Sequence, residues 1–332
     1  MPGFSEVARY GRTRGRGIGS GLFEHTEPLV LEARPDAEVA IERARLGAIS
    51  IGRVTSTGHT VGVREPVGLT LLVPASGRMG CTVRGETLQA ARGEALFHSP
   101  NRRSTHVAPS TDARFVGIPV VIPEAEIRIA AERVGVSSAA QSGFDAFALK
   151  LSAQTQPQVA ELLQMTEVLC SGLSRGAPGF ASEAVRSSWA ALLTESLMEI
   201  LQLCQGDVPR TSSRSQSMVR IARRAREYMN DNTAAVHTVA DVARAQGISL
   251  RSLQLACREI LDLTPNELLT EVRLERARRA LLSEDGAGSV AEAAFTHGAN
   301  HLGRFAQKYR ERFGESPSET LSRRQQRGRK EN

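Results

Sequence analysis

Polar side chains that can read DNA bases occur in two predicted helices in the last third of the chain. In the first helix Arg251 and Gln254 lie three residues apart, and in the second Arg304 is the strongest candidate. An arginine can donate two hydrogen bonds to guanine, and a glutamine can pair with adenine. Arg258, further along the first helix, is expected to contact phosphate. The complete set of candidate DNA contacts is Ser249, Leu250, Arg251, Gln254, Arg258, Asn300, His301, Arg304, Gln307 and Lys308.

These residues belong to a repeated pattern that covers 239–269 and 290–321. Each copy opens on Val-Ala followed by an acidic residue, has a glycine at the same distance (Gly247 or Gly298), and ends with Ser or Thr before a proline. A short helix, a glycine that permits a left-handed turn and a capped second helix are typical of a helix-turn-helix. The pattern predicts two such motifs, at about 239–260 and 290–313. Ser249 and Asn300 are the expected caps of the second helices.

The segment 264–282 reads as a cap followed by one continuous helix between the two motifs. A rigid helix here would fix the spacing of the two reading helices. Helices roughly 34 Å apart would enter successive major grooves on one face of a duplex. In the second motif Leu302, Phe305, Ala306, Tyr309 and Phe313 are expected to supply the core.

Charge is distributed unevenly along the 332 residues, which carry a formal net charge of +6. Residues 210–332 hold 22 Lys and Arg against 15 Asp and Glu, whereas the rest of the chain has a net charge of −1. A basic half beside a near-neutral half favours a nucleic-acid module joined to a module with another task. The sequence has no run of about 18 apolar residues, so we expect no membrane partner and a cytoplasmic, nucleoid-associated protein.

The first half of the chain is predicted to be β-rich over 46–122, where short apolar or alternating runs are separated by glycine and proline. Many strands at short spacing favour a barrel or a sandwich. Helical periodicity follows in three segments. The expected strands are Leu46–Val54, Thr60–Arg64, Gly68–Val73, Met79–Val83, Ala95–His98 and Phe115–Ile122, and the expected helices are Glu124–Val134, Pro157–Leu173 and Ala181–Cys204.

These patterns together predict an α+β protein of two domains. The N-terminal domain is a β-barrel with packing helices, and the C-terminal domain is all-α, with two helix-turn-helix motifs joined by a central helix. The expected divisions are a disordered basic arm (1–20), an effector and dimerisation domain (21–175), a helical dimerisation or packing segment (176–205), a linker (206–217), a DNA-binding domain (218–324) and a basic tail (325–332).

Several motifs carry a family resemblance. They are Gly247-Ile248-Ser249 with Arg251-Ser252-Leu253-Gln254, then Thr264-Pro265, Arg273-Leu274 with Ala277-Arg278, and Arg304-Phe305 with Tyr309, Phe313-Gly314 and Ser316-Pro317. The pattern resembles the AraC/XylS family of bacterial transcription regulators over about 218–324, and His301-Leu302-Gly303-Arg304-Phe305 is similar to the XylS branch. Cys257 and Ala299 depart from the family, which often has phenylalanine there. Both are expected core positions.

The resemblance implies DNA contact by the helices Ser249–Arg258 and Asn300–Lys308, and a cupin-like N-terminal module. It also implies double-stranded promoter DNA, RNA polymerase and a second copy of the chain as partners. A small aromatic or organic acid is the implied effector. Arg102 or Arg103, near His98, could meet its carboxylate; the alternative for each arginine is a surface position.

Enzyme functions find little support in the sequence. A methyl-accepting repair protein needs an activated cysteine in a metal-binding cluster, and the four cysteines are scattered. A cupin enzyme needs converging metal ligands, but His59, His98 and His106 form no His-x-His pair. We therefore expect no catalytic residue, metal or cofactor. The favoured hypothesis is a sequence-specific activator that responds to an effector; a repressor or an effector-independent regulator remains the alternative.

Overall fold

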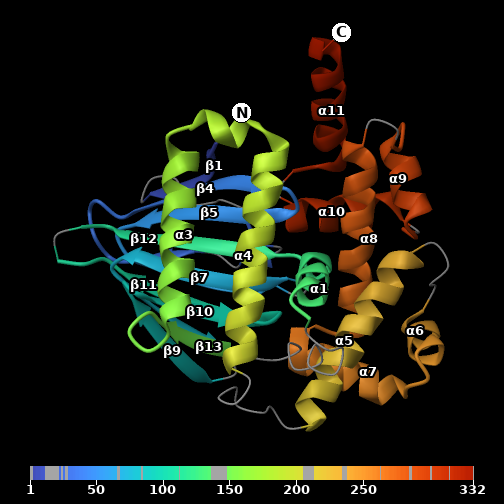
Figure 1. Cartoon of the computed structure of the whole chain (residues 1–332). Helices are drawn as coiled ribbons and strands as arrows, with labels where there is room; N and C mark the ends of the chain where they lie inside the picture. Colours follow the sequence, from blue (N-terminus) through green and yellow to red (C-terminus); the bar gives the residue numbers. More distant parts are fainter. Residues whose placement is uncertain are drawn as a thin grey trace. The chain divides into compact units, whose positions relative to one another are not determined.

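The chain forms two compact units, Met1–Gln216 and Ser217–Asn332. The computed structural model describes residues 3–331 except for 12–21, 24, 27–28, 66–67, 84, 112, 136–147, 205–212, 234–237, 262, 284–285, 300 and 314. Strands and helices make up the first unit, and the second is helical (Figure 1). Among the described helices, none combines the length and apolar content that crossing a membrane requires.

Two antiparallel sheets form the core of the first unit. The larger sheet has seven strands in the order β1, β4, β5, β12, β7, β10, β13. The smaller one follows the order β2, β6, β11, β8, β9, and β3 also pairs with β6. The strands are β1 (Ser5–Gly11), β2 (His25–Thr26), β3 (Val30–Leu31), β4 (Glu38–Leu46), β5 (Ile49–Ser56), β6 (His59–Glu65), β7 (Leu69–Ser76), β8 (Arg78–Val83), β9 (Glu86–Ala91), β10 (Glu94–His98), β11 (Asn101–Ala108), β12 (Phe115–Ile122) and β13 (Ala148–Ser152).

Side chains alternate between the two faces of these strands, because successive residues of a strand point in opposite directions. On β7 and β10, Leu71 and Phe97 belong to the hydrophobic cluster that also contains helix residues. Leu72, which follows Leu71, and Leu96, which precedes Phe97, belong to a second cluster with residues of β8, β9 and β11. The larger sheet is therefore covered on both faces, by helices on one side and by the smaller sheet on the other.

The helices of this unit are α1 (Glu124–Arg133), α3 (Pro157–Ser174), the short 3-10 helix η2 (Pro178–Ala181) and α4 (Glu183–Leu203). Figure 1 shows α3 and α4 lying across one face of the larger sheet. Leu162 of α3 and Leu193 of α4 are buried in the same hydrophobic cluster as Ile51 of β5. This burial of apolar surface anchors both helices to the sheet.

The expected disordered arm over residues 1–20 is wrong for its described part. Ser5–Gly11 forms β1, which pairs with β4 from Ser5 opposite Arg43 to Gly11 opposite Glu38. Tyr10 is buried and joins a small cluster with Val39 and Ile41. The prediction missed this because a single buried aromatic residue in a Gly- and Arg-rich stretch gives little hydrophobic signal. Residues 12–20 of the expected arm lie outside the described part of the chain.

The second unit contains α5 (Ser213–Asp231), α6 (Val239–Ala245), α7 (Leu250–Ala256), the π-helical turn η4 (Cys257–Leu261), α8 (Pro265–Leu282), α9 (Val290–Thr296), α10 (Leu302–Phe313) and α11 (Pro317–Glu331). In Figure 1, α8 runs from the neighbourhood of α6 and α7 towards α9 and α10. It packs against α6, α9, α10 and α11. The predicted central helix is thus present, with both helix-turn-helix motifs built onto it.

The second helix of the first motif is an α-helix to Ala256 and continues as a π turn to Leu261. Two expected boundaries in this half of the chain differ from the structure. Helix α5 begins at Ser213, inside the expected linker, and α11 continues to Glu331, so the expected basic tail extends a helix. The start of α5 and the end of α11 were not predicted because both consist of polar and charged residues without an apolar stripe.

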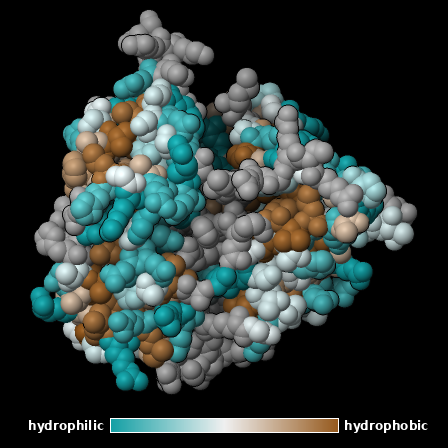
Figure 2. Space-filling model, turned by 180° about the vertical axis from the view of Figure 1, so that it is seen from behind, coloured by the Kyte–Doolittle hydropathy of each residue, from teal (hydrophilic) through white to brown (hydrophobic). Residues whose placement is uncertain are grey.

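The surface of the protein is mixed in character. On the face drawn in Figure 2, hydrophobic residues gather in several separate patches between hydrophilic ones. Exposed hydrophobic side chains include Val168 and Leu192, which are 53% and 51% exposed on α3 and α4. Single exposed residues of this kind are common in proteins and identify no interface by themselves.

Candidate nucleic-acid interface and effector cavity

Each helix-turn-helix motif is held by the same set of local interactions. Gly247 has φ +64° and Gly298 has φ +79°, so both turns use the left-handed conformation that glycine accepts without strain. The residue after each glycine donates a backbone hydrogen bond into the preceding helix, Ile248 to Ala243 at 3.0 Å and Ala299 to Ala294 at 2.9 Å. The repeat seen in the sequence is therefore also a repeat of backbone geometry.

Hydroxyl side chains begin the helices of these motifs. The Oγ of Ser249 accepts a hydrogen bond from the backbone N–H of Ser252 at 3.0 Å, which caps α7 as expected. Thr264 and Glu267 form a reciprocal capping box at the start of α8. Such caps satisfy amide groups that a helix leaves unpaired, each worth about 1 kcal/mol. Asn300, the expected cap of α10, lies outside the described residues.

Helix α7 separates its apolar and polar sides as the sequence indicates. Leu253 and Ala256 are fully buried. Arg251 and Gln254 are exposed, and so is Arg258 in the π turn that follows. Ser249 and Leu250 are also exposed. All five candidates of the first motif are thus accessible to a ligand.

Helix α10 has the same division. Phe305 and Tyr309 are buried, and their tilted rings are in contact with centroids 5.6 Å apart. The Tyr309 hydroxyl donates a hydrogen bond to Thr320 at 2.9 Å. The described candidates on the other side are all exposed: His301, Arg304, Gln307 and Lys308.

One residue of α10 was assigned to the wrong side. Leu302 was expected in the core but is 40% exposed, close to the 39% of Leu250, the first residue of α7. Each leucine is the first residue of the second helix of its motif. Leu302 was misplaced because its apolar character matched the helical periodicity of Phe305 and Tyr309.

A buried ionic cluster connects α5, α8 and α10. Glu275 of α8 accepts hydrogen bonds from Arg226 at 3.1 Å and from Arg312 at 3.0 Å. The three side chains are only 15%, 11% and 9% exposed. Because the two arginines come from the first helix of the unit and from the second recognition helix, Glu275 fixes the position of α10 on the central helix.

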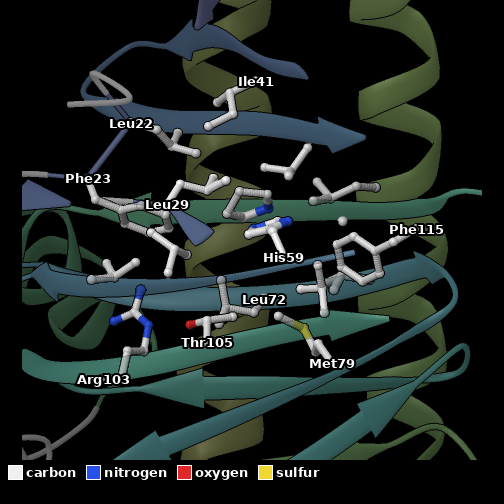
Figure 3. Close-up of a pocket in the computed structure, with 18 of the residues that line it drawn as sticks. Leu22, Phe23, Leu29, Ile41, His59, Leu72, Met79, Arg103, Thr105 and Phe115 are labelled. Atoms are coloured by element: carbon white, nitrogen blue, oxygen red, sulfur yellow. The ribbon is translucent and has the colours of Figure 1, made fainter. Parts of the chain in front are cut away.

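A separate cavity lies between the two sheets of the first unit. It holds about 710 Å³ of space between atoms, a volume that includes space open to solvent. Figure 3 shows Arg103, Thr105 and His59 among apolar side chains that include Phe23 and Phe115. The lining residues are Tyr10, Leu22, Phe23, Leu29, Ile41, Val54, His59, Val61, Val63, Leu72, Val73, Met79, Arg103, Thr105, Val107, Phe115, Gly117, Ile118 and Pro119.

The three residues expected near an effector are placed differently by the structure. Arg103 lines the cavity and is 2% exposed, so the expected alternative of a surface position is wrong for it. Arg102 is exposed because β11 alternates between buried and exposed residues, and it does not line the cavity. His98 is fully buried on β10 but is not a lining residue either.

His59, on β6, is another titratable residue that lines the cavity. Its Nδ1 lies 2.8 Å from the Oγ of Ser56. Burial, and to a lesser degree the charge of His106, lowers the pKa of His59 to about 4. The ring is therefore neutral at pH 7 and offers hydrogen bonding without charge.

The described residues contain no group of three or more His, Cys, Asp or Glu that could hold a metal ion. The four cysteines are buried and free. Burial raises the pKa of the Cys257 thiol to about 12, which keeps it protonated and unreactive at neutral pH.

Two family models match the chain. An AraC-binding-like domain matches residues 23–199, more than half of the sequence, and a helix-turn-helix domain matches residues 242–323. The first match contains the cavity-lining residues except Tyr10 and Leu22, and the second contains α7 and α10.

Curated relatives match over different lengths. The probable thc operon regulatory protein of Rhodococcus erythropolis is 28% identical over 316 residues, which cover 92% of each chain. The XylDLEGF operon transcriptional activator 3 of Pseudomonas putida is 37% identical over 100 residues, 30% of each chain. The crystal structure of ToxT from Vibrio cholerae aligns with 82% of this chain and 96% of its own at 12% identity and a TM-score of 0.48. The matched models and relatives describe regulatory proteins, not enzymes.

Proposed function

The chain belongs to the AraC/XylS family of transcriptional regulators, and on this premise we propose that it binds promoter DNA through α7 and α10 in two successive major grooves. The observation that carries this proposal is the exposed polar face of each recognition helix, presented by two motifs of the same geometry on one central helix. The net charge of +7 over residues 210–332 supports it, because positive charge attracts the phosphate backbone. Its site of action is then the nucleoid.

We further propose that the protein activates transcription, together with RNA polymerase. Relatives that match its C-terminal part are operon activators by name. A promoter fused to a reporter gene tests the sign of regulation: deletion of the gene for this protein should lower expression. Higher expression after deletion would identify a repressor.

The first unit is proposed to sense a small organic effector in the cavity between its sheets. An effector that binds one state of the protein more tightly than another shifts the equilibrium towards that state. Pairing of two copies through α3 and α4 is proposed as well, since both helices lie on the outer side of the larger sheet.

Arg304→Ala is the sharpest single test of DNA reading. Loss of a bidentate hydrogen-bonding contact with one guanine should weaken binding to the promoter by about 1–3 kcal/mol and relax the preference at one base pair. Fluorescence anisotropy with a set of single-base variants of the site, at fixed salt, measures both effects.

The matched control is Arg310→Ala, in the same helix and also exposed. We propose Arg310 as a phosphate contact, so its loss should weaken binding to promoter and random DNA alike and lower the salt dependence of binding. If Arg304→Ala behaved in the same way as Arg310→Ala, Arg304 would be a phosphate contact and not a base contact.

A further inference from the structure

Helix α10 carries a hydrogen bond between two side chains on its exposed face. Nε2 of Gln307 donates to Oε1 of Glu311 at 2.9 Å, and both residues are exposed. Residues three or four apart on a helix are neighbours, so Arg304, Gln307 and Glu311 follow one another along the same face. The buried side of the helix, with Phe305 and Tyr309, is opposite.

The hydrogen bond determines which end of the Gln307 amide faces Glu311. A carboxylate only accepts hydrogen bonds, so the amino group of the amide must point towards it. This contact uses one N–H of the amino group and leaves one donor and one acceptor, the other N–H and the carbonyl oxygen. Without Glu311 the amide could turn over, because the last torsion of a glutamine side chain is broad and roughly two-fold.

An amide held in this way distinguishes the two purines. In the major groove adenine presents the N7 acceptor beside the N6 amino donor, which matches one donor and one acceptor of the amide. Guanine presents two acceptors, N7 and O6. The carbonyl oxygen of Gln307 would face O6, and two unpaired acceptors cost binding free energy. An amide that turns over avoids this cost by offering its amino group to guanine.

The Glu311 carboxylate is unfavourable for general DNA binding. A negative charge on a DNA-facing helix is repelled by the phosphates, so it lowers the affinity for every sequence. Selectivity depends instead on the difference in affinity between two sequences, and a group that weakens the wrong complex raises it. The contact with Gln307 is therefore expected to act on base preference and not on overall affinity.

The first motif contains the glutamate but not the pair. Arg258 and Arg310 occupy matching places in the repeat, and each is followed by an exposed glutamate, Glu259 or Glu311. Four residues before Glu259 the chain has Leu255, whose side chain cannot donate a hydrogen bond. Glu259 thus has the same charge in the matching place, without an amide to hold.

We propose that Glu311 is a positioning residue that holds the Gln307 amide in the orientation that reads adenine, so that one A·T pair of the DNA site is selected against G·C. Gln307 touches the base, and Glu311 acts through Gln307. This inference rests on the proposed DNA binding by α10 and names a residue that determines its specificity.

The test begins with a random duplex library, from which the full chain selects its preferred site. Fluorescence anisotropy at fixed salt then compares all single-base variants of that site. At one base pair, Gln307→Ala and Glu311→Ala should each reduce the preference for adenine over guanine by about fivefold or more, as expected for one good base contact. Glu311→Ala should also bind random DNA more tightly, because a negative charge is lost.

Three comparisons separate positioning from charge. Glu259→Ala should tighten binding to random DNA in the same way and leave every base preference unchanged. Glu311→Gln also removes the charge but keeps an acceptor oxygen, so it should retain part of the adenine preference. In a protein that already carries Gln307→Ala, adding Glu311→Ala should not change the preference further. All three side chains are exposed, and thermal melting should show that every variant is folded.

An unchanged adenine preference in Glu311→Ala would overturn the proposal. A loss of preference that is as large without Gln307 as with it would do the same, because the carboxylate would then contact a base itself. Failure of the proposed function has a different signature, since the native protein would select no preferred sequence from the library. A selected site whose base preferences are insensitive to Glu311 would contradict this inference alone.

Discussion

Replacing Arg251 and Arg304 together by alanine is expected to remove most of the protein's preference for its promoter over random DNA. Each arginine is exposed on a different recognition helix, so each can read a separate base pair. Contacts at separate sites add, and losses of about 1–3 kcal/mol each give a combined loss of roughly 30-fold to 20,000-fold in specific affinity. Competition anisotropy with promoter and random duplexes at fixed salt measures the ratio directly.

The control for this double variant removes the same charge elsewhere. Arg220 and Arg224 are exposed on α5, outside both motifs. Their replacement by alanine should lower affinity for promoter and random DNA in the same proportion, because it changes only the general attraction to phosphate. Preservation of the promoter preference in the Arg251 and Arg304 variant would show that the exposed arginines do not read bases.

The second large effect is expected for Glu275→Ala. This change leaves Arg226 and Arg312 buried without their shared carboxylate, and the loss of one partner from a buried ion pair costs about 3–5 kcal/mol. Because Arg312 belongs to α10 and Arg226 to α5, the second motif should loosen from the central helix. Hydrogen exchange of the full chain is followed by mass spectrometry. Compared with the native protein, the variant should exchange faster in α8 and α10, with a smaller change in the first unit.

Glu227→Ala provides the comparison for Glu275→Ala. Glu227 is an exposed glutamate of α5 that lies 4.0 Å from Arg223, and a surface pair of this kind contributes at most about 1 kcal/mol. Its loss should leave exchange in α8 and α10 nearly unchanged. An equally small change for Glu275→Ala would mean that the buried cluster does not hold α10 in place.

The helical unit was the part best predicted from the sequence, for local reasons. Gly247 and Gly298 marked turns that need a left-handed backbone, and Ser249 and Thr264 marked helix starts through hydrogen bonds within three residues. These signals depend on neighbouring residues alone. What they could not give was the Glu275 cluster, whose partners are 49 and 37 residues away.

Only the general β-rich character of the first unit was predicted from the sequence, because packing and strand pairing determine its strands more than local patterns do. Strand β11 was missed: its inward positions include Asn101, Arg103 and Thr105, so no apolar alternation marks it. Short or polar strands β1–β4, β9 and β13 were also absent from the expected set. For the same reason the burial of Arg103 and the exposure of Arg102 could not be distinguished until the register of β11 was known.

Hydroxyl-radical footprinting of the full chain on its promoter tests most directly the claim that two recognition helices read one duplex together. We predict two protected blocks on one face of the DNA, with centres about one helical turn or 10 base pairs apart. Arg251→Ala should weaken one block and Arg304→Ala the other. A single protected block, or two blocks on opposite faces of the duplex, would contradict the account.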